Sequence, residues 1–117
     1  MYHTKTLTFI EQPVFTELLL ELVDDDAYRR FQNELAANPE KGPLVKHSGG
    51  LRKARLALLG RGKSGGGRVL YLWFPRHRTI VFYFVYTKGE MENIPAAKMK
   101  AIKHEVQRIK KTFGEGD

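Results

Sequence analysis

The segment "GGLRKARLALLGRGKSGGGRVLYLW" (residues 49–73) places six cationic residues and seven glycines in 25 positions, and it contains no acidic residue. Its ends, "LRKARLAL" (51–58) and "RVLYLWF" (68–74), predict two strands, and "TIVFYFVYTK" (79–88) predicts a third. The third run in particular is rich in β-branched and aromatic residues, which favour strands. The connections are the Gly-rich "LGRGKSGGG" and the tight "PRHR". Such short links predict an antiparallel meander.

The residues on either side of this meander predict one more strand and three helices. "TLTFIE" (6–11) alternates like a strand, and Pro13 suits the start of a helix over "VFTELLLELV". Asp24–Asp26 suit the cap and first turn of a second helix, "AYRRFQNELAANP". "AAKMKAIKHEVQRIKKTF" (96–113) predicts the last helix. The order predicts a single α+β domain over residues 1–117: a curved antiparallel sheet with two N-terminal helices and one C-terminal helix.

The charge of this chain is concentrated in its middle. The formal net charge is +7, yet no Asp or Glu occurs between residues 41 and 88. The cations of that interval are Lys41, Lys46, Arg52, Lys53, Arg55, Arg61, Lys63, Arg68, Arg76, Arg78 and Lys88. A localised excess of positive charge indicates an anionic partner, such as a nucleic acid.

Composition and spacing exclude several classes of protein. Without cysteine the chain has no disulfide and no thiolate metal site, and a reducing cytoplasm is its simplest location. No apolar run is long enough for a membrane span, and "MYHTKTLTFIEQP" lacks the core of a signal peptide. Gly60 lies too close to Lys63 for a nucleotide-binding phosphate loop, and a strand follows where a helix is required. The histidines are scattered and predict no metal site: His3, His47, His77 and His104.

The predicted strands carry a group of cations on one side. On a strand, Lys53 and Arg55 point to one face, while Arg52 points to the other. Arg68 begins the next strand, close to that pair. Such cations suit contacts to a phosphate backbone, although a solvated face that prevents edge aggregation is an equal alternative. The loop cations Arg61 and Lys63 could close over a nucleic acid, or the loop could be only a hairpin connection.

The aromatic residues of the second and third strands have two possible roles. About two thirds of them are expected in the core, because alternate positions of a central strand are buried. Tyr86 and Lys88 are the expected exceptions, since they end a strand and share a face. The full set is Tyr71, Trp73, Phe82, Tyr83, Phe84 and Tyr86.

Four motifs in the expected order give the chain a resemblance to the RelE/HigB superfamily of bacterial toxins, especially its HigB-like branch. They are "GGLRKAR", "GRGKSGGGRVLYLW", "YTKGE" and, nearer the N-terminus, "FIEQPVF" with "YRRFQNELAANPEKG". The resemblance covers most of the chain. It implies a toxin of a type II toxin–antitoxin system: a ribosome-dependent, metal-independent endoribonuclease that cleaves translated mRNA, needs no cofactor and is neutralised by a helix-turn-helix, HigA-like antitoxin.

The resemblance also implies roles for individual residues. Lys53 and Arg55 match the basic pair of the active-site strand, and Arg68 matches the arginine that stabilises the phosphorane. Lys88 matches the lysine of the family's "Y-KNE" turn, with Tyr86 beside it, and Gly89 stands where the family has asparagine. Arg52, Arg61 and Lys63 would bind RNA. Relatives use a tyrosine near the C-terminus, for which His104 or a helix lysine could substitute here.

A non-catalytic RNA- or ribosome-binding module of the same fold is the alternative function. A structural or adaptor protein is a third possibility. The enzyme is favoured because the cations coincide with the family's active-site positions and do not lie along an outer helix.

Overall fold

The computed structural model describes residues 6–58, 66–90 and 94–115. Its elements follow the predicted order, so the α+β class is confirmed. They are β1 (Thr8–Glu11), α1 (Pro13–Leu22), α2 (Asp25–Ala37), β2 (Arg52–Leu56), β3 (Gly67–Phe74), a short 3₁₀ turn (Pro75–His77), β4 (Thr79–Thr87) and α3 (Ala96–Thr112). No helix within the described residues is both long enough and apolar enough to cross a membrane.

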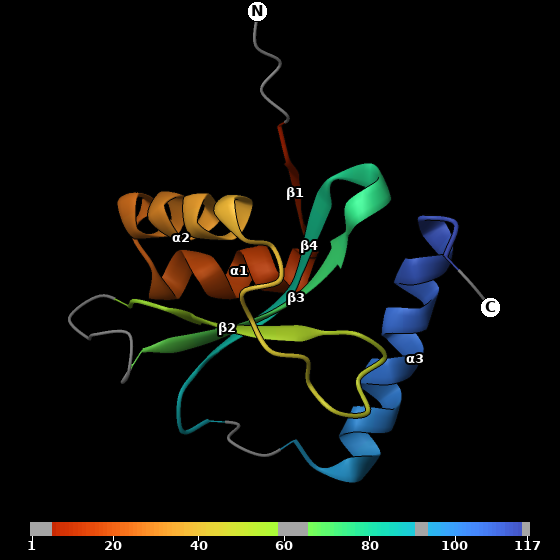
Figure 1. Cartoon of the computed structure of the whole chain (residues 1–117). Coiled ribbons are helices and arrows are strands. Elements are labelled where there is room, and N and C mark those ends of the chain that lie inside the picture. Colours follow the sequence, from red (N-terminus) through yellow and green to blue (C-terminus); the bar gives the residue numbers. More distant parts are fainter. Residues whose placement is uncertain (1–5, 59–65, 91–93, 116–117) are drawn as a thin grey trace, which may run out of the picture.

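The four strands form one sheet in the order β1-β4-β3-β2 (Figure 1). The β2–β3 and β3–β4 pairs are antiparallel, as the short links predicted. β1 lies parallel to β4, so the sheet is mixed and the prediction of a fully antiparallel sheet was wrong for this edge. A hairpin turn forces neighbouring strands to be antiparallel, whereas β1 reaches β4 through two helices and two strands and is free of that constraint.

The two N-terminal helices begin where the sequence predicted. Pro13 occupies the first turn of α1, where its missing N–H costs no hydrogen bond. The Asp24 carboxylate accepts a hydrogen bond of 2.7 Å from the backbone N–H of Ala27, and Asp25 and Asp26 follow in the first turn. These side chains satisfy a free backbone donor and complement the positive end of the helix dipole.

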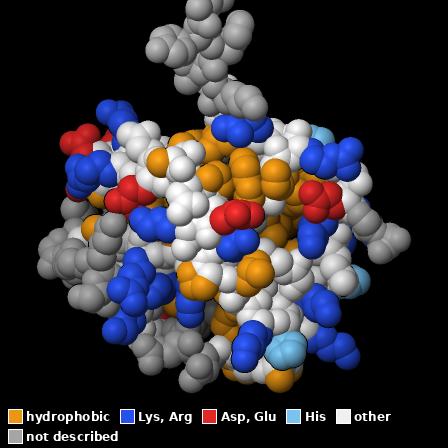
Figure 2. Space-filling model, viewed as in Figure 1, with side chains coloured by type: hydrophobic (Ala, Val, Ile, Leu, Met, Phe, Trp, Pro, Cys, Tyr) orange, Lys and Arg blue, Asp and Glu red, His pale blue; other side chains and the backbone are white. Residues whose placement is uncertain are grey.

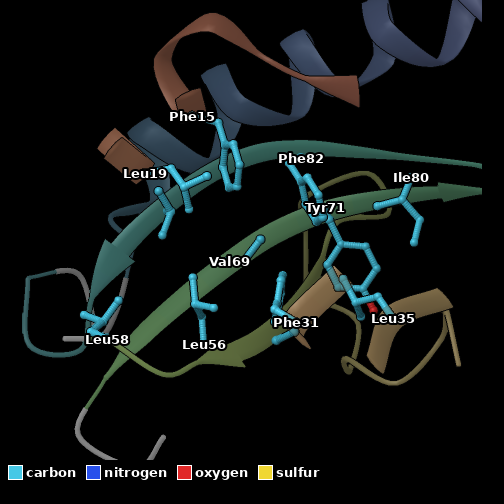
Figure 3. Close-up of a cluster of buried hydrophobic side chains, with 12 residues drawn as sticks. Phe15, Leu19, Phe31, Leu35, Leu56, Leu58, Val69, Tyr71, Ile80 and Phe82 are labelled. Carbon is cyan, nitrogen blue, oxygen red and sulfur yellow. The ribbon is translucent and has the colours of Figure 1, made fainter. Parts of the chain in front are cut away.

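One face of the sheet packs against α1 and α2. Phe82 of β4 is fully buried there, and its ring lies 5.0 Å from that of Phe15 and 5.9 Å from that of Phe31, centre to centre. Figure 3 shows these rings beside Tyr71 and Val69 of β3. This aromatic cluster joins both N-terminal helices to the centre of the sheet.

α3 covers only part of the opposite face of the sheet. Val106 of α3 is buried among Leu70, Leu72 and Val81, and the ring of Phe113 stacks on that of Phe74 at 4.2 Å. α3 also lies close to the segment just before β2, since a Cβ atom on Gly49 would lie 3.3 Å from Val106 Cγ1. Gly49 also has φ +84°, so this position favours glycine for two reasons.

A β-bulge in β4 changes which residues share a face. Leu70 of β3 is opposite Phe84, but Tyr71 is opposite Phe82, so Tyr83 has no residue of β3 opposite it in the strand register. Phe82 lies in the core under α1 and α2, whereas Phe84 and Tyr86 belong to the other face. The bulge therefore shifts the alternation of the strand by one residue and increases the local twist.

Candidate functional site

A cavity of about 600 Å³ opens on the part of the sheet that α3 leaves uncovered. It contains all five residues predicted to be catalytic. Its lining comes from β2, β3, the end of β4 and the loop before β2: Lys41, Gly42, Pro43, Lys53, Ala54, Arg55, Arg68, Tyr86, Lys88 and Gly89. Five of these described residues are cations and none is acidic.

The strand register explains why these side chains meet. Arg55 of β2 is directly opposite Arg68 of β3, and Arg68 is directly opposite Tyr86 of β4. Directly opposed Cβ atoms in antiparallel strands are about 5 Å apart, so the three side chains form one row across the sheet. Lys53 lies two residues before Arg55 on the same face, as predicted. One Arg68 N–H group donates to the carbonyl oxygen of Gly67 at 3.0 Å, which orients part of its guanidinium.

The loop over residues 39–44 forms the outer wall of the cavity. Tyr71 holds this loop from the opposite face of the sheet: its hydroxyl donates to the carbonyl of Pro39 at 2.8 Å and accepts from the N–H of Gly42 at 3.0 Å. Burial raises the pKa of Tyr71, against smaller opposing effects of the Gly42 hydrogen bond and the Arg52 charge, so the phenol stays protonated as a donor.

Gly42 lies against the edge strand too closely for a side chain. A Cβ atom at this position would approach the backbone oxygen of Lys53 to 2.6 Å. The backbone N–H of Lys53 also donates to the carbonyl of Pro43 at 3.0 Å. The wall of the cavity is therefore hydrogen-bonded to the strand that carries Lys53 and Arg55.

Three residues were predicted to bind RNA, and the structure describes one of them. Arg52 is directed away from the cavity, and its guanidinium donates to the carbonyls of Gly42 at 2.8 Å and Glu40 at 3.2 Å. This arginine fastens the cavity wall, and its contact with RNA stays a prediction. Arg61 and Lys63, with the basic loop that contains them, lie outside the described residues.

The expectation that Tyr86 lies outside the core was wrong. Its side chain is only 5% exposed and packs in the cluster under α3, because β3 and β4 are both central strands of the sheet. Tyr86 nevertheless borders the cavity together with Lys88, as their shared face predicted. Tyr71 and Phe82 are buried as expected, and Trp73, Tyr83 and Phe84 are half-buried.

A tight turn presents Lys88 at the mouth of the cavity. The carboxylate of Glu90 accepts hydrogen bonds from the backbone N–H of Thr87 at 2.7 Å and from its hydroxyl. Gly89 has φ +105°, a conformation that favours glycine, and a Cβ atom there would meet no neighbour within 4 Å. The glycine therefore fits the geometry of this turn where the family has asparagine.

The C-terminal helix contributes nothing to the lining of this cavity among the described residues. His104 is exposed on α3, and neither it nor a helix lysine borders the cavity among the described residues, so their substitution for a family tyrosine stays a prediction. Within the described ranges, no three His, Cys, Asp or Glu side chains are grouped as metal ligands.

Sequence reasoning missed Lys41 as a member of the site. The signal was present, because Lys41 is the first cation of the acid-free interval and lies in the "NPEKG" motif. Its Nζ donates to a carboxylate oxygen of Glu34 on α2 at 3.0 Å. Figure 2 shows Lys and Arg side chains gathered at the lower left of the molecule, near the ends of β2 and β3 in Figure 1.

An α+β fold whose sheet carries a cavity lined, among the described residues, by cations and no acid is suited to anionic groups. The comparison with known protein families identifies the family: residues 36–115 match the family model described as the RelE toxin of the RelE/RelB toxin–antitoxin system. The match spans β2, β3, β4 and α3, and every residue that lines the cavity lies inside it. The chain belongs to the RelE toxin family and is a toxin of a toxin–antitoxin system.

Proposed function

We propose that this toxin is a metal-independent endoribonuclease that cleaves mRNA on the ribosome and thereby stops translation. The observation that carries the proposal is the cavity, in which two arginines, three lysines and a tyrosine meet, with no acidic residue among the described residues that line it. Membership in the RelE family supports it, because toxins of this family are generally endoribonucleases.

The arginines suit the binding and stabilisation of phosphate. A guanidinium stays charged at all physiological pH values and presents a planar fork of donors that matches a phosphate. Arg55 and Arg68 are opposed across β2 and β3, so one phosphate can lie between them. The pair would stabilise the additional negative charge of the pentacoordinate phosphorane, with Arg68 making the closer contact from its half-buried position.

The proton transfers fall to the remaining polar side chains of the cavity. The RNA 2′-oxygen attacks phosphorus and loses its proton, while the bond to the 5′-oxygen breaks and that oxygen gains a proton. The products are a 2′,3′-cyclic phosphate and a 5′-hydroxyl. Lys53, Tyr86 and Lys88 border the same cavity as the arginine pair and carry protons that can be exchanged.

Cleavage is expected to depend on the ribosome. The cavity is open and binds RNA mainly through charge, which holds a phosphate but does not fix the angle between the 2′-oxygen and the leaving group. A ribosome that holds the mRNA supplies this orientation, and oriented reactants can react orders of magnitude faster. Purified protein should cleave an mRNA in a translation reaction and leave the same naked RNA almost intact. Efficient cleavage of free RNA would contradict the ribosome requirement.

The antitoxin is proposed to bind away from the cavity. The resemblance to the HigB-like branch favours a folded helix-turn-helix antitoxin, which would block entry to the ribosome by its bulk. The N-terminal helices offer a mixed surface for it: Leu20 is 76% exposed, and exposed acidic residues occur on α1 and at the start of α2. These are Glu17, Glu21, Asp24, Asp25 and Asp26.

A double substitution separates this arrangement from direct coverage of the cavity. Lys53→Ala with Arg55→Ala should abolish toxicity and leave tight antitoxin binding, with slower association at most, because charge steers association more than it sets affinity. Titration calorimetry and stopped-flow mixing with the antitoxin measure both quantities. Loss of affinity by about a hundredfold or more would show that the antitoxin covers the cavity itself.

A further inference from the structure

A much smaller hollow lies across the open edge of the sheet from the cavity. It has a volume of about 40 Å³ and is lined by Ala27, Arg30, Phe31, Glu34, Arg55, Leu56 and Ala57. The helical members share one face of α2, since they are spaced three and four residues apart. Arg55 lines both the hollow and the cavity, so the two depressions are neighbours on either side of this residue.

The charge of this hollow suits a second phosphate group. Arg30 is exposed on α2 and Arg55 is exposed on β2, and among the described residues neither makes an ion pair. Arg30 and Arg55 both line the hollow, so a phosphate held there by Arg30 would also be attracted by the positive charge of Arg55. The acidic residue of the hollow, Glu34, accepts a hydrogen bond of 3.0 Å from Lys41, which offsets its negative charge.

The edge of β2 is open where the two depressions meet. Main-chain hydrogen bonds from residues 43 and 45 cover the start of β2: Lys53 donates to Pro43, and Val45 donates to Leu51. No such bond reaches Arg55 from outside the sheet among the described residues, since its register partner is Arg68 within it. Among the described residues, no other main chain is hydrogen-bonded to this edge beside Arg55, so an RNA chain in the cavity can pass over it there.

We propose that single-stranded RNA leaves the cavity over the edge of β2 and that Arg30 binds the phosphate of the nucleotide next to the cleavage site, while Arg55 stays with the phosphate that is cleaved. The inference rests on the proposed function, because it extends the same RNA chain by one subsite. It assigns to α2 a role in holding substrate that the strand cations alone do not have. Such a contact adds affinity and no sequence preference.

Two neighbouring arginines on α2 allow a matched test. Arg30→Ala removes a cation that lines the hollow, and Arg29→Ala removes the same charge from an exposed position that does not line it. The probe is a fluorescent single-stranded RNA of about 12 nucleotides with methylated 2′-oxygens, which cannot be cleaved. Arg30→Ala in the full chain should weaken binding roughly fivefold and reduce the slope of log K against log salt by about 0.7, and Arg29→Ala should change neither by as much.

The length of the RNA provides the second arm of the test. A probe of about three nucleotides occupies the cavity only, so Arg30→Ala should leave its affinity unchanged. Equal losses for Arg29→Ala and Arg30→Ala, equal losses for both probes, or no measurable binding of the longer probe would overturn the proposal. So would an Arg30→Ala chain that keeps its RNA affinity and loses only its antitoxin, which would assign the hollow to a protein. Failure of the proposed function is seen separately, as absence of cleavage during translation.

Discussion

Replacement of Arg68 by alanine is expected to abolish the growth arrest that follows induction of this toxin. The side chain lies in the centre of the row Arg55–Arg68–Tyr86 and lines the cavity. Removal of one preorganised donor to a transition-state oxyanion costs about 10²–10³-fold in rate. A loss of that size in mRNA cleavage during translation should allow cells to grow without the antitoxin. Growth curves after induction and primer-extension mapping of cleaved transcripts measure the two effects.

Two further variants show whether the effect comes from position and geometry. Arg76→Ala removes the same charge from an exposed turn that does not line the cavity, and it should stay toxic. Arg68→Lys keeps the charge but loses the planar fork, so it should recover only part of the rate. Circular dichroism and thermal melting confirm folding. A folded Arg68→Ala protein as toxic as its parent would remove Arg68 from the proposed mechanism.

Truncation of Phe82 is expected to cost about 3–5 kcal/mol of the free energy of unfolding, as is usual for buried aromatic residues. Phe82 is fully buried at the point where β4 meets α1 and α2. Its ring stacks on those of Phe9 at 5.6 Å and Phe15 at 5.0 Å. Since small domains are stable by only about 5–15 kcal/mol, Phe82→Ala should leave a marginal protein. Urea denaturation followed by fluorescence of Trp73 measures the change.

Phe84→Ala is the matched control for this prediction. It makes the same chemical change two residues further along β4, on the other face of the sheet, where the ring is half-buried. The half-buried ring of Phe84 buries less apolar surface than the ring of Phe82. Its removal should therefore cost clearly less of the free energy of unfolding. Equal losses for the two variants would contradict the assignment of the main core to the α1–α2 side.

Much of the fold followed from local patterns. Pro13 and Asp24 marked the starts of α1 and α2, and two short links made β2, β3 and β4 antiparallel. The parallel position of β1 was missed because no local turn connects it to β4. Strand alternation predicted that Lys53 and Arg55 share a face, and the connection between the strands predicted that Arg68 lies near them; the register of β2 and β3 then showed that Arg68 shares that face.

The sequence by itself determined which charges the site would contain, since the acid-free interval from Lys41 to Lys88 supplies every cation of the cavity. Only the tertiary structure decided how they are arranged. Phe82 and Tyr86 are four residues apart and would share a face on a regular strand, but the bulge at Tyr83 moves Tyr86 to the cavity side. Likewise, Arg30 borders Arg55 only because the core packs α2 beside β2. Alternation and charge are local properties, whereas a bulge and a helix position depend on how distant side chains fill one core.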